Sequence, residues 1–214
     1  MSQTYFNFHP IDQELQDYFI LHSGVSNPYK QALSFIDGLD DIGGSVFFIY
    51  GPKGCGKTFF IEILTKICAD KQIQTEVFKV DLDGKVFSTD NELKETTEVV
   101  DCYQDIKTNG GLIFFESQKL PAENMVDVHL KSRMLSGEVY ALDYPSEEEL
   151  KPVLKSLLER HHLRLKDSHL DQILNNIPAI PEYFEAVSKS LIELIPSTGR
   201  LKKSSLREVL EFRQ

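Results

Sequence analysis

The chain has 214 residues, 41% of them hydrophobic and 26% charged, a balance typical of a globular protein with one compact core and a small appendage. The net charge of −10 falls entirely on residues 1–144, because residues 145–214 carry 11 basic and 11 acidic side chains. A segment this acidic is poorly suited to hold duplex DNA by phosphate neutralisation alone. Apolar stretches such as Ser45–Tyr50 are too short to span a bilayer.

The N-terminus lacks the basic start and apolar core of a signal peptide. The three cysteines, Cys55, Cys68 and Cys102, show neither an even count nor metal-ligand spacing. These features predict a reduced, cytoplasmic protein without a membrane segment.

The first two thirds of the chain alternate between helical and strand-forming patterns. A turn at Asn27-Pro28 is expected to lead into an amphipathic helix. The segments that follow, in chain order, are predicted as a strand (Ser45–Tyr50), a helix (Thr58–Ala69), a strand (Glu76–Leu82), a helix (Glu92–Lys107) and two strands (Leu112–Phe115 and Glu138–Leu142). Such alternation predicts a mainly parallel sheet.

From Tyr144-Pro145 onward no strand pattern occurs. Ser146 has the sequence context of a helix N-cap with an acidic first turn, and apolar residues follow at helical spacing. Further helices are expected over 167–176 and 181–195, and a last one from about Ser204. These helices predict an all-helical subdomain of about seventy residues.

One motif carries the chemistry of the first part of the chain. Gly51-Pro52-Lys53-Gly54-Cys55-Gly56-Lys57-Thr58 matches the P-loop pattern in full, between a buried strand and an apolar-faced helix. The glycines let successive backbone N–H groups face phosphate oxygens. Lys57 supplies a charge to the outer phosphates, and the Thr58 hydroxyl is placed to ligate magnesium. The sequence therefore predicts a site for a nucleoside di- or triphosphate.

Several motifs in this order resemble the AAA+ module of the bacterial initiator family DnaA. They are the P-loop, the run Leu130-Lys131-Ser132-Arg133-Met134, the strand and turn from Ile113 to Pro121, and the helix after Tyr144-Pro145. The resemblance implies a three-layer α/β P-loop AAA+ fold with a parallel sheet and a C-terminal all-helical lid, and it implies ADP or ATP with Mg²⁺ as cofactors. The expected domains are 15–144 for the nucleotide-binding domain and 145–214 for the lid.

Within that family the sequence looks most like the Hda-type regulators. The sequence ends where DnaA would begin its helix-turn-helix domain, which implies no autonomous sequence-specific DNA binding. Residues 1–14 are expected to form a flexible segment in which Gln3, Phe6 and Phe8 resemble the peptide that docks on the replicative sliding clamp. The alternative is a frayed terminus that merely contains aromatics.

In the resembled family Arg133 is an arginine finger, which reaches a nucleotide held by a neighbouring subunit. A planar, permanently charged guanidinium stabilises charge on a transferring phosphoryl group. The alternative is an arginine paired with a surface carboxylate.

The acidic residues expected for hydrolysis are incomplete. Asp81 is the best candidate for the Walker B acid that holds Mg²⁺, but Leu82 stands where a second acid is usual. The spacing between Lys57 and Asp81 is short for the resembled family. It indicates that a strand-helix unit is lost, or that the Walker B strand itself is missing. Glu182 stands where the family has the sensor 2 arginine, and a carboxylate there would repel phosphates. Weak or absent intrinsic ATPase activity is therefore expected.

The resemblance implies a regulator of chromosome replication initiation that binds the sliding clamp and promotes hydrolysis of ATP bound to DnaA. It leaves self-association open. A first alternative is a nucleotide-gated adaptor or loader that recruits a replication protein without stimulating hydrolysis. A second is a small-molecule P-loop kinase, for which Arg160 and Arg164 are the only lid arginines in the 145–165 segment.

Overall fold

The structure is a computed structural model, and it describes residues 20–39, 44–160, 163–178 and 180–194. Six strands form one sheet in the order β4-β3-β2-β5-β1-β6. The strands are β1 (Ser45–Tyr50), β2 (Thr75–Val80), β3 (Val86–Ser88), β4 (Leu93–Lys94), β5 (Leu112–Ser117) and β6 (Glu138–Ala141). β1 pairs in parallel with β5 and β6, and β5 in parallel with β2, which confirms the predicted, mainly parallel sheet.

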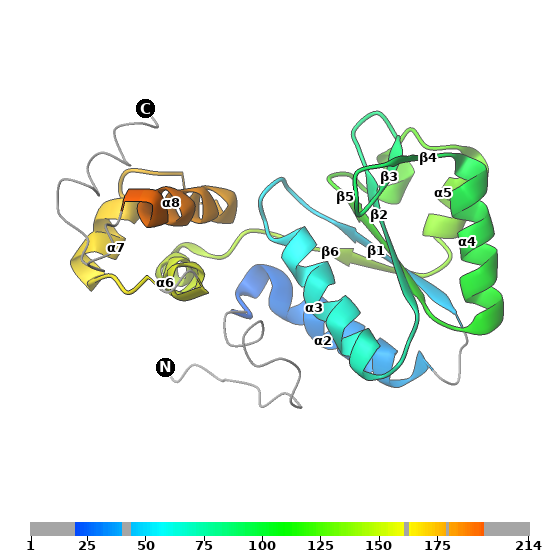
Figure 1. The fold of residues 1–214 in the computed structure, drawn as a ribbon, viewed down its shortest axis with the longest axis horizontal. Coiled ribbons are helices and arrows are strands. Elements are labelled where there is room, and N and C mark those ends of the chain that lie inside the picture. The colour runs from blue at the N-terminus through cyan, green and yellow to red at the C-terminus, as the bar shows by residue number, and fades with distance from the viewer. Residues whose placement is uncertain (1–19, 40–43, 161–162, 179, 195–214) are drawn as a thin grey trace.

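Helices cover both faces of this sheet (Figure 1). The helices of the first part are α2 (Ser23–Asp37), α3 (Lys57–Asp70), α4 (Thr96–Asn109) and α5 (Val128–Met134). Side chains of α2 and α3 share one apolar cluster with the sheet, whereas those of α4 and α5 share another. The result is the predicted three-layer α/β arrangement.

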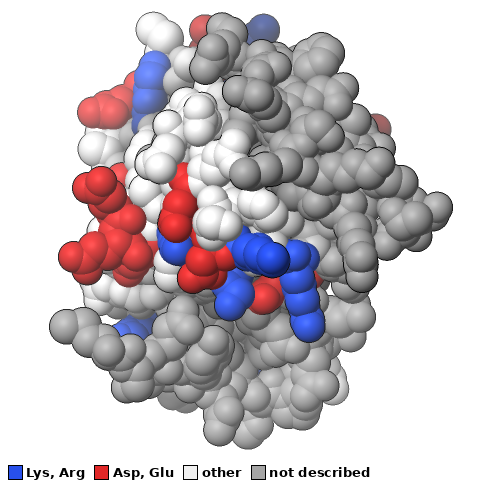
Figure 2. Space-filling view, turned by 90° about the vertical axis from the view of Figure 1, so that its left-hand side faces the viewer, with Lys and Arg blue, Asp and Glu red and all other residues white. Residues whose placement is uncertain are grey.

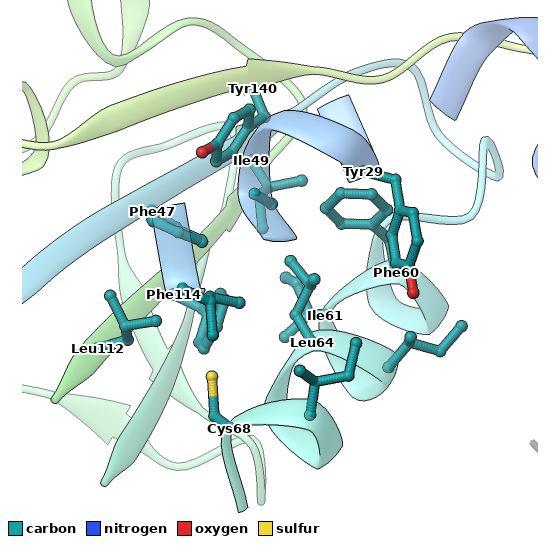
Figure 3. Packing of buried hydrophobic residues seen from close by; sticks show 14 of the residues in the cluster. Tyr29, Phe47, Ile49, Phe60, Ile61, Leu64, Cys68, Leu112, Phe114 and Tyr140 are labelled. Atoms are coloured by element: carbon teal, nitrogen blue, oxygen red, sulfur yellow. The ribbon is translucent and has the colours of Figure 1, made fainter. Parts of the chain in front are cut away.

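The two apolar clusters follow from the strand sequences. In β1, Phe47 and Ile49 belong to the cluster on the α3 face, and Val46 and Phe48 to the cluster on the α4 face. Alternation along a strand points successive side chains to opposite faces, so a strand buried on both faces must be apolar throughout. On the α3 face Phe47 meets Phe114 and Tyr140 edge to face, as Figure 3 shows.

The helices after the sheet form a third apolar cluster of their own. They are α6 (Leu150–Arg160), α7 (Asp167–Leu174) and α8 (Pro181–Leu194). Their buried side chains contact one another and the partly buried Ile20. The expected N-cap is present: Ser146 and Glu149 form a capping box at the short 3₁₀ turn Glu147–Glu149 that leads into α6.

On the described part of the surface in Figure 2, acidic and basic side chains lie beside one another. Ion pairs also join two of the C-terminal helices, where Lys151 of α6 lies 2.8 Å from Asp171 and 3.6 Å from Asp167 of α7. Exposed pairs of this kind contribute at most about 1 kcal/mol each. Among the described residues, no helix is both long enough and apolar enough to cross a membrane.

The prediction that Pro28 precedes the first helix is wrong. α2 begins at Ser23, and Pro28 lies inside it. A proline has no N–H for the carbonyl four residues earlier, which here is that of Gly24. The Gly24 carbonyl instead accepts from the backbone N–H of Asp143, at 3.1 Å. A contact distant in sequence therefore replaces the hydrogen bond that Pro28 cannot make.

The segment after β2 also differs from its prediction. The helix expected from Glu92 begins at Thr96, and the preceding Leu93–Lys94 pairs with β3 as a strand. The helix begins late because Glu95 and Glu98 form a capping box there. The antiparallel strands β3 and β4 extend the sheet at one edge, in a region for which the sequence predicted no strand.

Candidate nucleotide-binding site

The predicted P-loop connects β1 to α3 at the carboxyl edge of the parallel strands. Gly54 and Gly56 have φ values of 79° and 98°, in the left-handed region that favours glycine. Gly51 is required for space: a Cβ there would lie 2.3 Å from the Leu142 carbonyl oxygen and 3.1 Å from the Cys55 Sγ. Gly56 caps α3 without a side-chain hydrogen bond, so the loop leads directly into a helix N-terminus. Such a terminus favours anions.

Lys57 is the buried cation of this loop. Its side chain is 6% exposed, and its Nζ donates to the carbonyl oxygens of Gly51, at 2.9 Å, and Pro52, at 2.8 Å. The ammonium group thus lies within the curve of the loop instead of extending into solvent. Lys57 therefore places a full positive charge where the loop would bring phosphate oxygens.

The three cysteines do not offer a thiolate at neutral pH. Burial raises the pKa of Cys55, although Lys57 opposes this shift. Burial also raises the pKa of Cys68 to about 12 and that of Cys102 to about 11. Protonated thiols are poor nucleophiles, so Cys55 acts in the P-loop as an apolar packing residue.

Thr58 contacts an acid that the sequence reasoning missed. Its hydroxyl donates to the carboxylate of Glu116, with Oγ1 2.9 and 3.0 Å from the two oxygens. Glu116 lies near the end of β5, in register with Ile49 of β1. The signal in the sequence is a single acid directly after the apolar run Leu112–Phe115.

Asp81 has a different environment. It follows β2 directly, and its Oδ1 accepts from the backbone N–H groups of Asp83, at 2.9 Å, and Lys85, at 2.8 Å. These hydrogen bonds close the turn between β2 and β3, in which Gly84 has a φ of 82°. The structure thus brings Glu116, and not Asp81, to Thr58. The role of Asp81 in holding Mg²⁺ stays a prediction.

A buried polar network shapes the turn after β5. The Ser117 hydroxyl donates to Asn124 Oδ1 at 3.1 Å, and the Asn124 amide donates to the carbonyls of Lys119 and Leu120. Asn124 is 2% exposed, so losing these bonds would leave buried polar groups unsatisfied. The network ties the end of β5, which carries Glu116, to the turn that follows it.

The segment between the sheet and the C-terminal helices contacts the P-loop. The hydroxyl of Tyr144, which follows β6, donates to the Lys53 carbonyl at 2.7 Å. The sequence pattern indicates Tyr144 only as part of the boundary at Tyr144-Pro145. In the structure it ties the start of the helical part to the glycine-rich loop.

The same segment is anchored on the N-terminus of α2. A Cβ on Gly24 would lie 2.3 Å from the Asp143 carbonyl oxygen, so only glycine allows this approach. Glu149 accepts from the backbone N–H and the hydroxyl of Ser23, at 2.8 and 2.6 Å. His22 caps α2 through Nδ1, which accepts from the Gly24 N–H at 3.2 Å. Burial lowers the pKa of His22 despite the nearby carboxylates, so its neutral, accepting form is favoured.

This junction is expected to weaken in acid. Partial burial alone would raise the pKa of Glu149, but hydrogen bonds from Ser23 and Ser146 outweigh it and lower the pKa to about 2. A lowered pKa in the folded state means that the stabilisation is complete above about pH 4.5 and is lost as the pH falls towards 2. Glu149→Gln should therefore lower the Tm at pH 7, by roughly 2–4 °C after allowance for solvent screening.

The measurement is a series of thermal melts of both proteins from pH 7 to pH 3. The Tm difference should shrink as the pH falls below about 4.5. Glu148→Gln is the matched control, because Glu148 is an exposed neighbour in the same turn, and its Tm should equal that of the wild type at every pH. A Tm difference for Glu149→Gln that does not change with pH would contradict the assignment.

Arg133 lies on α5, on the α4 face of the sheet and therefore opposite α3. Its guanidinium carbon is 5.5 Å from the centroid of the Tyr103 ring, and its Nη1 donates to the His129 carbonyl at 2.9 Å. Its Nε is buried without a hydrogen-bond partner. The side chain thus packs on α4 rather than on a surface carboxylate. The role of Arg133 as a finger stays a prediction.

Other predicted site residues lie outside the described part of the chain. These residues are Gln3, Phe6 and Phe8. The helix expected from Ser204 also lies outside the described residues. Glu182 is within α8, but its side chain is not among those described.

The described groups fit a magnesium nucleotide. A glycine-rich loop opens a helix without a side-chain cap, a buried ammonium group lies within the loop, and a hydroxyl–carboxylate pair lies beside it. Phosphates would be held by the loop and Lys57, and Mg²⁺ by Thr58 together with a carboxylate. The carboxylate that the geometry brings to Thr58 is that of Glu116.

Sequence comparison relates the chain to a replication initiator. It is similar to the chromosomal replication initiator protein DnaA of Oleidesulfovibrio alaskensis, with 26% identity over 134 residues. The match covers 59% of this chain and 29% of that protein, so the chain spans less than a third of the relative's length. No family model matches the chain.

Structural comparison extends the likeness to nearly the whole chain. Domain III of DnaA from Thermotoga maritima superposes with a TM-score of 0.73 and 19% identity, over 95% of this chain and 98% of that one. AMPPCP-bound DnaA from Aquifex aeolicus superposes with a TM-score of 0.60 and 17% identity, over 82% of this chain and 63% of that one. The RuvB branch migration motor of T. maritima superposes with a TM-score of 0.58 and 16% identity, over 88% of this chain and 68% of that one. The chain therefore has the fold of domain III of DnaA.

Proposed function

We propose that this chain is a nucleotide-binding regulator of chromosome replication initiation, of the Hda type. The observation that carries the proposal is the complete P-loop geometry within a fold that matches domain III of DnaA over 95% of the chain. The relative that carries the bound analogue AMPPCP is itself a DnaA, which supports an adenine nucleotide as the ligand.

In this proposal the chain acts on ATP held by a partner. It docks on the sliding clamp through Gln3, Phe6 and Phe8, and it presents Arg133 to the nucleotide of DnaA. To do so, the guanidinium group must leave the Tyr103 ring, a contact worth about 0.5–1 kcal/mol at exposed sites. That cost is small beside the effect of an arginine finger on phosphoryl transfer.

One observation favours the alternative of an adaptor that recruits a replication protein without stimulating hydrolysis. Arg133 is already engaged within the chain, because its guanidinium lies over the Tyr103 ring and its Nη1 donates to its own helix. An arginine held in this way can stabilise α5 against α4 and need not reach another subunit. The two functions therefore differ in whether hydrolysis by the partner is accelerated.

The test mixes the full chain with ATP-loaded DnaA and clamp assembled on DNA, and measures phosphate release. We expect release to rise well above that of DnaA with clamp alone. A chain lacking residues 1–8 should lose most of this stimulation and should bind immobilised clamp at least tenfold more weakly, because aromatic anchors dominate such small interfaces. Its Tm should equal that of the full chain.

Each outcome has a separate meaning. Clamp binding without stimulated phosphate release would favour the adaptor. Equal clamp binding by the truncated chain would show that residues 1–8 are not the docking segment. If the chain neither binds the clamp nor stimulates phosphate release, the proposed function is overturned, even if the chain binds nucleotide.

A further inference from the structure

We propose that Glu116 of β5 supplies the carboxylate of the magnesium site, in place of an acid at the end of β2. The inference rests on the nucleotide binding proposed above and identifies the residue that would make it depend on a divalent cation. It is carried by the contact between Glu116 and the Thr58 hydroxyl, together with the strand order of the sheet.

The strand order places Glu116 closer to the P-loop than Asp81. β5 is hydrogen-bonded to β1, from which the P-loop continues, whereas β2 is hydrogen-bonded to β5 and not to β1. Neighbouring strands lie about 4.8 Å apart, so the end of β2 is about 10 Å from the line of β1 and the end of β5 about half as far. The end of β5 is therefore the nearer of the two, and the Glu116 carboxylate that it carries is within hydrogen-bond distance of Thr58.

Side-chain direction agrees with the strand order. Leu112 and Phe114 of β5 belong to the apolar cluster on the α3 face. Because side chains alternate along a strand, Glu116 points to this same face, where α3 begins with the P-loop residues Lys57 and Thr58. Ser117, the next residue, points to the other face and joins the network of Asn124.

The hydrogen bond to Glu116 also orients Thr58. A hydroxyl has one proton and two lone pairs, and donation to Glu116 uses the proton. The lone pairs then stay available as metal ligands. Mg²⁺ in nucleotide sites is held by one or two carboxylates together with phosphates and water, so one carboxylate beside Thr58 meets the requirement from the protein side.

Asp81, by comparison, already has a structural role. Its Oδ1 accepts two backbone N–H groups that close the turn from β2 to β3. Hydrogen bonds of this kind hold the Asp81 carboxylate in the orientation that closes this turn. Asn at this position could accept the same hydrogen bonds, because its amide oxygen occupies the same place.

The experiment is calorimetric titration of the full chain with ADP, in Mg²⁺ and again in EDTA. The quantity compared is the ratio of the two dissociation constants. Glu116→Gln should reduce the gain from Mg²⁺ by about tenfold or more, as for other groups that support a metal site. In EDTA the variant should bind ADP at least as tightly as the wild type, because a negative charge near the phosphates has been removed.

Asp81→Asn is the matched control, and its gain in ADP affinity from Mg²⁺ should stay within twofold of that of the wild type. Unchanged Mg²⁺ dependence in Glu116→Gln would overturn the inference, as would loss of that dependence in Asp81→Asn. A wild-type chain that binds ADP equally with and without Mg²⁺ would overturn it while leaving nucleotide binding intact. If the wild type binds no nucleotide in either buffer, the proposed function and the inference both fail.

Circular dichroism melts show whether Glu116→Gln folds. Should it not fold, Glu116→Asp decides, because the shorter side chain withdraws the carboxylate from the Thr58 hydroxyl. The Mg²⁺ dependence should then fall in that variant too, and an undiminished ratio would overturn the inference.

Discussion

Lys57→Ala is expected to weaken ADP and ATP binding by about 100-fold or more, because truncating one partner of a buried, hydrogen-bonded charge pair costs 2–5 kcal/mol. Lys57 is 6% exposed, and its Nζ lies within the P-loop, 2.8 and 2.9 Å from two of the loop's own carbonyl oxygens. Alanine removes the charge that would face the phosphates and leaves the backbone N–H groups of the loop in place.

Calorimetry with ADP and ATP measures the effect, and a thermal melt checks the fold. Lys71→Ala is the matched control, since Lys71 lies at the other end of α3, in an exposed ion pair with Asp37 at 3.0 Å. Such pairs contribute at most about 1 kcal/mol to stability, so nucleotide affinity should not change. Undiminished affinity in Lys57→Ala would refute the P-loop as the binding site.

Arg133→Ala is expected to reduce the stimulation of DnaA-bound ATP hydrolysis by about a thousandfold, within the range known for arginine fingers. The affinity of this chain for ADP should stay nearly the same, because α5 lies on the opposite face of the sheet from α3. Loss of a finger removes transition-state stabilisation and leaves ground-state binding intact. Arg133→Lys should be almost as inactive, since lysine lacks the planar fork.

Single-turnover phosphate release with ATP-loaded DnaA and clamp measures this effect. Lys131→Ala serves as the control on the same helix, where Lys131 donates to the Ala122 carbonyl at 3.0 Å. It should retain stimulation. Lost ADP affinity with preserved stimulation would place Arg133 at the chain's own nucleotide site or in a structural role, the latter in keeping with its position over the Tyr103 ring.

The features predicted from sequence are those that depend on neighbouring residues. The glycine spacing of the P-loop, the apolar runs of β1 and β5, and the Ser146 cap are each encoded within about ten residues, and the structure has the corresponding elements. Local steric rules and side-chain periodicity act over such distances, so they can be recognised without a tertiary structure.

The errors arose where a distant segment changed the local preference. Pro28 would ordinarily mark a helix start, but the Asp143 N–H satisfies the Gly24 carbonyl that Pro28 leaves free. Leu93 and Lys94 lie in a polar stretch, but β3 offers them a partner strand. In each case the deciding hydrogen bond comes from another part of the chain, and a pattern within one window cannot reveal it.

The sequence by itself determined the glycine-rich loop with Lys57 and Thr58 and the alternation of strands and helices, because these depend on backbone conformation and periodicity over short windows. Only the tertiary structure showed that Glu116 reaches Thr58 across 58 residues of sequence, and that Tyr144 bonds to the Lys53 carbonyl across 91. Strand order brings such residues together, and strand order depends on how the whole sheet packs between its helices.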